Sequence, residues 1–345
     1  MEDNEELIAA KEDVAVMIAR ARAAQEQIAD YTQEQVNELI TAMVWSVGRE
    51  DRSEEIARLA IDETQLGNYE GKYLKIHRKT RATLMDIIGD KSVGVIEEIP
   101  ERNIVKIAKP VGVIGALSPS TNPEATPVIK AISAVKGRNA IIVAPHPRAK
   151  LTNKKICDYM REAIVAMGGP ADLVQSIDIP SLDKTNELMQ QCDRILATGG
   201  AAMVSAAYSS GTPALGVGVG NAVITVDDSA DLDEAADKIR ISKTLDLAAS
   251  CSSDNSVLVF ESIYDEFLAK LKHAGGHVIE GEDKEKLQRV LWHDGHLNPG
   301  IVAQHAASIT SQAGIDLPEG KQFLIVPETG TGPDYPFSGE KLTVT

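Results

Sequence analysis

Apolar, strand-like runs alternate with helix-like segments through the middle of the chain. Val111–Leu117 and Ala140–Ala144 are almost wholly apolar, and segments with helical spacing follow them over 124–136 and 151–167. A strand that is apolar on both faces needs cover on both sides, so this alternation predicts a parallel sheet between layers of helices. The pattern continues with strands and helices expected at 194–197, 201–210, 221–226 and 231–247.

The flanking regions have different patterns. Residues 5–90 show helical spacing, with a capping box at Thr32 and Gln35 and a long helix expected over Tyr69–Ile88. A hairpin is expected from Val93–Ile99 and Ile104–Lys109. After residue 250, a strand over Ser256–Phe260 and a helix from Tyr264 predict the start of a second domain.

Charge and cysteine content exclude several classes of protein. The chain has 51 acidic and 35 basic residues, a net charge of −16, which argues against general binding to nucleic acid or anionic membranes. It contains no apolar stretch of about 18 residues, as a membrane span needs, and no signal-peptide pattern. Three cysteines without a C-x-x-C pair argue against a disulfide framework or a metal site and favour a cytoplasmic protein.

Cys251 is the strongest candidate for a catalytic residue. It lies in a run of small residues, Ala248–Ser253, so a substrate can approach its sulfur. A lone cysteine in a sequence is more often a packing residue, and Cys157 and Cys192 fit that interpretation.

Loops rich in glycine, proline and small polar residues follow the expected strands. Taken singly, each loop is more often just a tight turn, but four loops at the carboxyl edge of one sheet favour a bound ligand. The loops span 118–123, 144–148, 198–200 and 216–221. Between residues 111 and 156 seven basic residues accompany a single acid, Glu124, which predicts a positive surface for a phosphorylated small molecule.

Hydrolysis of a thioester needs a general base, and none is found where one is expected. Residues 199–226 contain no Asp or Glu, so this region offers no group to activate water against a thioester on Cys251. The acceptor of the acyl group is therefore expected to be something other than water. His146, between two prolines, is expected at the ligand edge, whereas His293, His296 and His305 are expected at the surface.

The chain as a whole resembles the CoA-acylating aldehyde dehydrogenases, above all the aldehyde domain of bifunctional aldehyde-alcohol dehydrogenases and the acylating sulfoacetaldehyde dehydrogenases. The similar segments occur in family order and cover nearly all of the sequence. They are PSTNP (119–123), APHPRAK (144–150), ILATGGAAMVSAAYSSG (195–211), GVGVGN (216–221), SKTLDLAASCSSD (242–254), LNPGIV (297–302) and PFSGEKL (336–342).

The resemblance implies an α/β fold of the aldehyde dehydrogenase type, with N-terminal helices and a dinucleotide-binding, parallel Rossmann-type domain over 1–240 and an incomplete α/β catalytic domain over 241–345. It implies that Cys251 is the nucleophile and that Asn122 holds the oxyanion. NAD or NADP is the implied cofactor, with coenzyme A as acyl acceptor. The implied cofactor-binding residues are Pro119, Pro145, His146, Arg148, Gly199, Gly200, Gly216, Gly218 and Glu340.

Two departures from the family pattern bear on function. The family has a hydrophobic residue, Cys, Ala and Ser at the nucleophile, whereas this chain has Ser250-Cys251-Ser252-Ser253, which favours a polar aldehyde such as sulfoacetaldehyde over acetaldehyde or propionaldehyde. Relatives also continue well past the EKL motif. A homo-oligomer is expected of a full-length form, and a non-catalytic nucleotide-binding or assembly module is the alternative for a shortened one. A dehydrogenase that hydrolyses its thioester is the other enzyme alternative.

Overall fold

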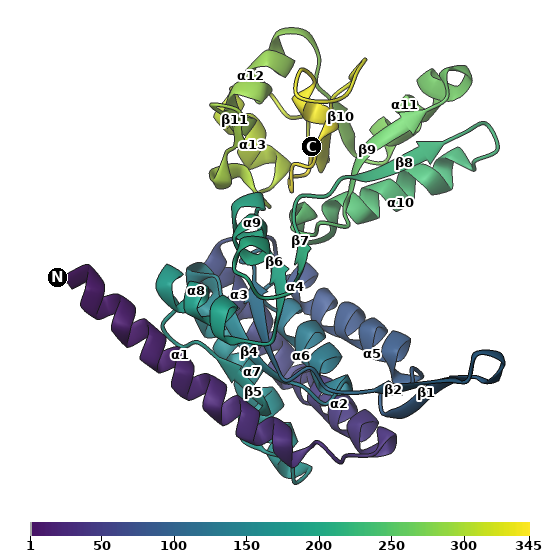
Figure 1. The fold of residues 1–345 in the computed structure, drawn as a ribbon. Helices are drawn as coiled ribbons and strands as arrows, with labels where there is room; N and C mark the ends of the chain where they lie inside the picture. Colours follow the sequence, from purple (N-terminus) through teal and green to yellow (C-terminus); the bar gives the residue numbers. More distant parts are fainter. Residues whose placement is uncertain (1) are drawn as a thin grey trace. The chain divides into compact units, whose positions relative to one another are not determined.

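Residues 2–345 are described by the computed structural model, with side chains from Glu5 onward, and they form two compact units (Figure 1). Unit 1 comprises the residues up to Gln65 together with Lys72–Gly218, and unit 2 comprises Leu66–Gly71 and Val219–Thr345. The division expected from sequence, at residue 240, falls inside a helix of unit 2. The functions assigned to the two domains stay predictions.

A five-stranded parallel sheet forms the centre of unit 1, in the order β5-β4-β3-β6-β7. Every residue of β3 and β4 is buried, which confirms the parallel sheet expected from the two apolar runs. The strands are β3 (Val113–Ser118), β4 (Ala140–Pro145), β5 (Val174–Ser176), β6 (Arg194–Thr198) and β7 (Ala214–Val217). The sequence analysis missed β5 and β7, which are too short for a clear pattern.

Helices cover this sheet in two sets. Helices α6 and α7 pack against each other and against β4, while α1 and α8 pack together and both contact β3. Helix α9 packs on β6 and β7, and α2 packs on the outer side of α6 and α7 (Figure 1). The helices are α1 (Glu2–Gln27), α2 (Gln33–Val47), α3 (Glu50–Thr64), α6 (Thr126–Lys136), α7 (Lys150–Ala166), α8 (Leu182–Gln191) and α9 (Ala201–Ser209).

The winding direction of the sheet reverses between β3 and β6. From β3 the chain adds β4 and then β5 on one side, and it then returns to add β6 and β7 on the other. Loops that leave neighbouring strands in opposite directions open a crevice at the carboxyl ends of those strands, where ligands of such sheets bind. The loops after β3 and β6 flank this point.

Two local expectations for the first 110 residues are confirmed. Thr32 and Gln35 form the capping box at the start of α2. The helix expected over 69–88 is present as α4 (Tyr69–Lys75) and α5 (Arg81–Ile88), joined by a π-helical turn over Ile76–Thr80.

The expected hairpin is also present, as β1 (Gly94–Ile99) paired with β2 (Ile104–Ala108). It exposes large apolar side chains, among them Val95, Val105 and Ile107. A two-stranded ribbon is marginally stable by itself in water, and an exposed apolar surface commonly marks an interaction site. The homo-oligomer expected from sequence stays a prediction. In such an oligomer, this hairpin offers an apolar surface for contact with a second subunit.

Unit 2 contains three two-stranded sheets. Strand β8 (Ala222–Val226) pairs in parallel with β9 (Asp254–Val259), and β10 (Gly276–Val278) pairs in parallel with β13 (Phe323–Ile325). A short antiparallel pair consists of β11 (Trp292–His293) and β12 (His296–Leu297). The helices are α10 (Leu232–Thr244), α11 (Tyr264–His273), α12 (Gly281–Leu291) and α13 (Ala306–Ala313).

The structure corrects two expectations here. The strand at 221–226 was expected in the same sheet as Val111–Leu117, but β7 forms the edge beyond β6 and β8 pairs with β9 instead. Helix α10 ends at Thr244, three residues before the expected 247, because the backbone turns to positive φ at Asp246.

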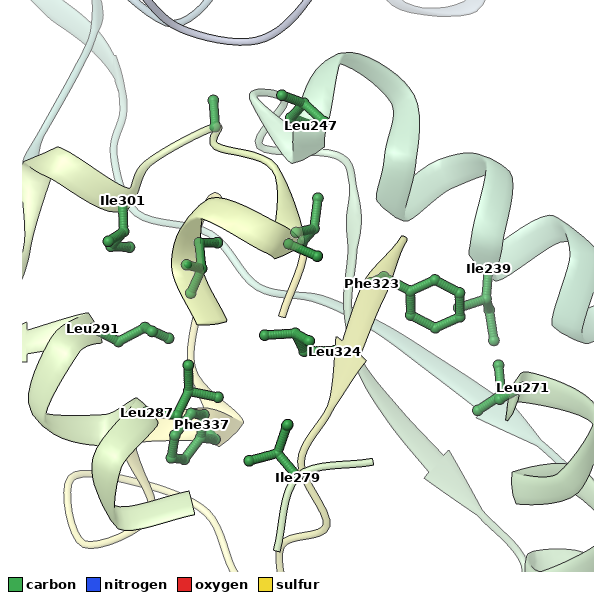
Figure 2. Close-up of a cluster of buried hydrophobic side chains, with 14 of the residues drawn as sticks. Ile239, Leu247, Leu271, Ile279, Leu287, Leu291, Ile301, Phe323, Leu324 and Phe337 are labelled. Atoms are coloured by element: carbon green, nitrogen blue, oxygen red, sulfur yellow. The ribbon is translucent and has the colours of Figure 1, made fainter. Parts of the chain in front are cut away.

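A hydrophobic core holds unit 2 together (Figure 2). Phe323 of β13 lies beside Ile239 of α10 and Leu271 of α11, and Leu247 marks one end of the cluster. Burial of such side chains contributes about 1.5–3 kcal/mol each, so this core anchors the segments on which Cys251 is carried.

Within residues 2–345, none of the helices has the length and apolar character that crossing a membrane requires.

Candidate active site

Cys251 is exposed in a tight turn of unit 2, whereas Cys157 and Cys192 are buried. The turn is closed by the hydrogen bond that Ser253 N donates to Ser250 O, at 3.0 Å, and the hydroxyls of Ser250 and Ser252 lie 3.2 Å apart. Asp254 N donates to Ser242 Oγ at 3.0 Å and so ties the end of the turn to α10. Burial raises the pKa of Cys157 to about 12 and that of Cys192 to about 11. Of the three thiols, Cys251 is therefore the one placed for nucleophilic chemistry.

A strained segment leads into this turn. Asp246, Leu247 and Ala248 have φ values of 50°, 52° and 61°, a left-handed conformation that costs free energy at residues other than glycine. Asp246 is buried, and its Oδ1 accepts a hydrogen bond from Asn68 N at 2.9 Å. Such strain is kept only where surrounding contacts impose it, and it is common at functional sites.

Two glycines in the segment 66–71 make room for Asp246. A Cβ on Gly67 would lie 1.9 Å from Asp246 Oδ1, and a Cβ on Gly71 would lie 2.5 Å from Asp246 Cα. Glycine is required at both positions for this close approach. The short segment from the first part of the chain therefore supports the backbone that precedes Cys251.

The motif PFSGEKL is fixed to the β8–β9 sheet, and this places Glu340. Asn255 Nδ2 donates to Gly339 O, and Asn221 Nδ2 donates to Ser338 O. Glu340 Oε2 accepts from Gly220 N at 3.3 Å, while its Oε1 is buried with no hydrogen-bond partner among the described residues. Burial raises the pKa of Glu340, which Lys243 and the amide of Gly220 partly offset. An unsatisfied buried oxygen is suited to a donor from a ligand, such as a ribose hydroxyl.

Burial shifts the pKa values of the ionisable groups around Glu340 in the direction that favours their neutral forms. Burial lowers the pKa of Lys341 to about 8, and it holds that of Lys243 well below the ordinary value for lysine. Burial also raises the pKa of Asp254. Lys341 Nζ donates to Phe337 O and Gly339 O, so it holds the backbone on either side of Ser338.

In unit 1, the expected residues after β3 and β4 lie at one edge of the sheet. Ser118, the last residue of β3, pairs with Pro145 of β4, and His146 N donates to Ser118 O at 3.0 Å. Pro119 and Asn122 follow in the same loop. His146 is exposed, and burial of part of the ring, with Arg148 nearby, lowers its pKa. His146 thus follows β4 at this edge, and its contact with a ligand stays a prediction.

The loop after β6 meets the same edge. Gly199 N donates to Val217 O, and Gly200 is the N-cap residue of α9. Lys130 Nζ donates to Leu117 O at 2.6 Å and to Leu196 O at 2.8 Å, and it thereby joins β3 to β6 at the reversal of the sheet. Burial lowers the pKa of Lys130 to about 7. The sheet edge thus brings Asn122, Pro145, His146 and the two glycines into one region.

The roles implied for three other residues gain less support. Gly216 lies within β7, where a Cβ would meet Val204 Cγ1 of α9 at 2.6 Å, so helix packing already explains this glycine. Gly218 has no such close contact. Arg148 Nη2 donates to Thr64 O at 2.7 Å. Binding of a cofactor by these residues stays a prediction.

Five of the seven basic residues in 111–156 are buried or paired, whereas Arg148 and Lys150 are exposed, so the positive surface stays a prediction. Lys130, Lys136 and Arg138 are buried and donate to backbone carbonyls, and Lys154 and Lys155 pair with acidic side chains. Apart from Lys154, whose partner Asp158 is four residues away, these residues are close to their partners in space but far from them in sequence, so they look unpaired in the sequence alone.

Several residues of the region were missed by sequence reasoning. Lys75 and Lys72 reach the loop that carries Asn122, and Asp246 anchors the segment before Cys251. The sequence signal for these residues was weak. Asp246 is a polar residue inside a family motif, and Lys72 and Lys75 are lysines within an expected helix. Among the described residues there is no cluster of three or more His, Cys, Asp or Glu with the geometry of a metal site.

Comparison with known proteins identifies the family. The model of the aldehyde dehydrogenase family matches residues 7–324. The chain is 45% identical to a sulfoacetaldehyde dehydrogenase of an Acholeplasma species, over 94% of this chain and 68% of that protein. Its fold matches an acetylating aldehyde dehydrogenase of Geobacillus thermoglucosidasius with a TM-score of 0.92 and 37% identity, over 98% of this chain and 75% of that one.

The chain belongs to the aldehyde dehydrogenase family, in its CoA-acylating branch. A propionaldehyde dehydrogenase of Rhodopseudomonas palustris, solved with bound propionyl-CoA, matches 94% of this chain with a TM-score of 0.80 and 26% identity, over 71% of that chain. This aldehyde dehydrogenase is therefore an oxidoreductase that acts on aldehydes with CoA, as the resemblance implied.

Alkylation tests the exposure of Cys251. Iodoacetamide at pH 8 should modify the native protein once, at Cys251, because the other two thiols are buried and keep their protons. Mass spectrometry of peptides measures this. A Cys251→Ala variant should take up no label until it is unfolded in guanidinium. Native labelling of Cys157 or Cys192 at a similar rate would contradict this assignment.

A Gly71→Ala substitution tests the support of the strained segment. We expect a loss of about 1–3 kcal/mol in the free energy of unfolding, because the new Cβ collides with the backbone of Asp246. Gly89→Ala is the matched control, since a Cβ there meets nothing within 4 Å and φ is −79°. Denaturant unfolding followed by circular dichroism compares the two variants. Equal stabilities would show that Gly71 has no such role.

Proposed function

We propose that this enzyme oxidises a small polar aldehyde, with sulfoacetaldehyde as its substrate, to the acyl-CoA while NAD⁺ or NADP⁺ is reduced. The balanced reaction is aldehyde + CoA-SH + NAD(P)⁺ → acyl-CoA + NAD(P)H + H⁺. The observation that carries the proposal is the exposed sulfur of Cys251 in a turn of small residues, within a chain of the acylating branch.

Cys251 and Asn122 have the central roles in this proposal. The Cys251 thiolate adds to the aldehyde carbon, and the carbonyl oxygen becomes an oxyanion for which the Asn122 amide is a suitable donor. When bound, the dinucleotide would accept the hydride that leaves the former aldehyde carbon, so that Cys251 then carries the acyl group as a thioester. The thiol of CoA then attacks the thioester on Cys251, and the cysteine leaves as its thiolate.

Each unit has residues whose chemistry fits a dinucleotide. The buried, unsatisfied Oε1 of Glu340 is available to a ribose hydroxyl, and the sheet edge formed by Pro145, His146, Gly199 and Gly200 lies where α/β sheets bind nucleotides. Arg148 is an available cation beside this edge. The choice between NAD and NADP is left open by these residues.

The polar setting of Cys251 supports the choice of substrate. Ser250, Ser252 and Ser253 adjoin Cys251 in the sequence. Hydroxyl groups are hydrogen-bond donors, which suit the sulfonate of sulfoacetaldehyde better than the methyl group of acetaldehyde. The relative from Acholeplasma is named for the same aldehyde. Acetaldehyde and propionaldehyde are the competing substrates.

Turnover assays test the proposal. Purified protein with NAD⁺ or NADP⁺ should form NAD(P)H from sulfoacetaldehyde in a CoA-dependent manner, with a higher kcat/KM than for acetaldehyde or propionaldehyde. Cys251→Ala should reduce this rate to background, and Cys157→Ala, a buried cysteine, should leave it nearly unchanged. Turnover without CoA would indicate hydrolysis. Binding of NAD(P)⁺ without any turnover would favour a non-catalytic module.

Dinucleotide binding tests Glu340 without turnover. A Glu340→Gln variant should bind NAD(P)⁺ about tenfold or more weakly, because a hydrogen bond to a charged group contributes about 1.5–3 kcal/mol. Isothermal titration calorimetry measures the dissociation constant. Glu319→Gln, at an exposed position, is the control. Unchanged affinity in Glu340→Gln would remove this residue from the cofactor site.

A further inference from the structure

A cluster of buried charges lies directly behind the loop that carries Asn122. Lys72, Lys75 and Glu124 have side-chain exposures of 0%, 1% and 0%. Glu124 Oε2 is 3.6 Å from Lys72 Nζ, and its Oε1 is 3.3 Å from Lys75 Nζ. Burial opposes ionisation of Glu124, but the two lysines outweigh it and hold its pKa below the ordinary value. All three residues belong to unit 1.

Burying two ammonium groups and one carboxylate is costly. The desolvation of each ion costs several kcal/mol, and apolar side chains of similar volume would often stabilise a fold better. Orientation of a neighbouring group is one reason for a fold to keep such a cluster. The contacts of the two lysines show which group this is.

Both lysines reach the loop after β3, but they contact different atoms. Lys75 Nζ donates to the side-chain oxygen of Asn122, Oδ1, at 2.7 Å. Lys72 Nζ donates to the backbone oxygen of Thr121, also at 2.7 Å. Asn122 Nδ2 donates to Thr121 Oγ1 at 3.1 Å. Lys75 is thus the member of the cluster that acts on the amide itself.

We propose that Lys75, held in place by Glu124, is a positioning residue that orients and polarises the Asn122 amide for its role toward the substrate oxyanion. The inference rests on the proposed function, in which Asn122 is the oxyanion donor. An ammonium group has only donors, so the amide must turn its oxygen to Lys75 and its amino group away from it. The reversed amide would set two donors against each other.

The charge of Lys75 also strengthens the donor. A charge-assisted hydrogen bond to Oδ1 draws electron density toward the oxygen and makes the N–H groups on Nδ2 more positive. In a buried setting this polarisation is little screened by water. Loss of Lys75 therefore weakens the oxyanion interaction even where Asn122 is still present.

Lys75→Met tests the proposal, with Lys72→Met as the matched control. Each substitution removes one buried lysine and leaves the other beside Glu124, so the two variants change the cluster by the same charge. We expect Lys75→Met to lower kcat by about 10²–10³-fold, the loss seen when an oxyanion donor is removed, with little change in the KM for NAD(P)⁺. Lys72→Met should lose at least tenfold less. Equal losses in the two variants would overturn the proposal.

A double-mutant cycle with Asn122→Ala separates positioning from a general structural role. If Lys75 acts through Asn122, then Lys75→Met should cause no further loss of kcat in the Asn122→Ala background. Multiplicative losses would show that Lys75 acts elsewhere. Thermal unfolding of each variant checks that the fold is kept.

A measurement without turnover keeps this inference separate from the proposed function. The side-chain NH₂ signals of Asn122, assigned by their absence in Asn122→Asp, report the rigidity of the amide. Their hydrogen exchange should accelerate at least tenfold in Lys75→Met and stay nearly unchanged in Lys72→Met. Wild-type protein that lacks CoA-dependent turnover would defeat the proposed function, whereas unchanged exchange in Lys75→Met would defeat the positioning role.

Discussion

The complete burial of β3 and β4 is the constraint on which unit 1 depends. Strands that are apolar on both faces must be covered on both faces, so helices connect the strands and pack on each side of the sheet. Crossovers of one hand then place α6 and α7 together and α8 in the other set, and the winding direction reverses between β3 and β6. The reversal fixes where the candidate ligand edge of unit 1 lies, because the loops after these two strands diverge there. Lys130 holds the two strand ends together through two carbonyls.

Buried polar and charged side chains recur near the candidate site residues. In unit 1, Glu124 and two lysines lie behind Asn122. In unit 2, Asp246 anchors the turn that leads to Cys251, and Lys341 holds the backbone that presents Glu340. Each of these groups costs desolvation free energy, which hydrogen bonds and opposite charges partly offset. In return, these groups hydrogen-bond to the loops that carry the candidate site residues.

The sequence analysis succeeded where local periodicity was strong. The apolar runs at Val111–Leu117 and Ala140–Ala144 predicted buried parallel strands, and Thr32 with Gln35 predicted a helix start. It failed for β5 and β7, which are too short to show a period, and for residues 221–226, whose strand joins β9 rather than β6. Strand partners are chosen by packing between segments far apart in the chain, and local patterns do not record that choice.

The candidate site divides in the same way. The types and order of the key residues, such as Cys251 among serines and Asn122 between Thr121 and Pro123, are legible in the sequence, because chemistry depends on residue type and families preserve motifs. The side chains that surround these residues cannot be predicted from the sequence in this way. The contact of Lys75 with Asn122 spans 47 positions and that of Asn68 with Asp246 spans 178. The sequence by itself determined the sheet type and the family and predicted the reactive residues, since these follow from local pattern and residue chemistry. Only the tertiary structure decided which lysines are buried, which strands pair and which group contacts the Asn122 amide, because these depend on contacts between distant segments.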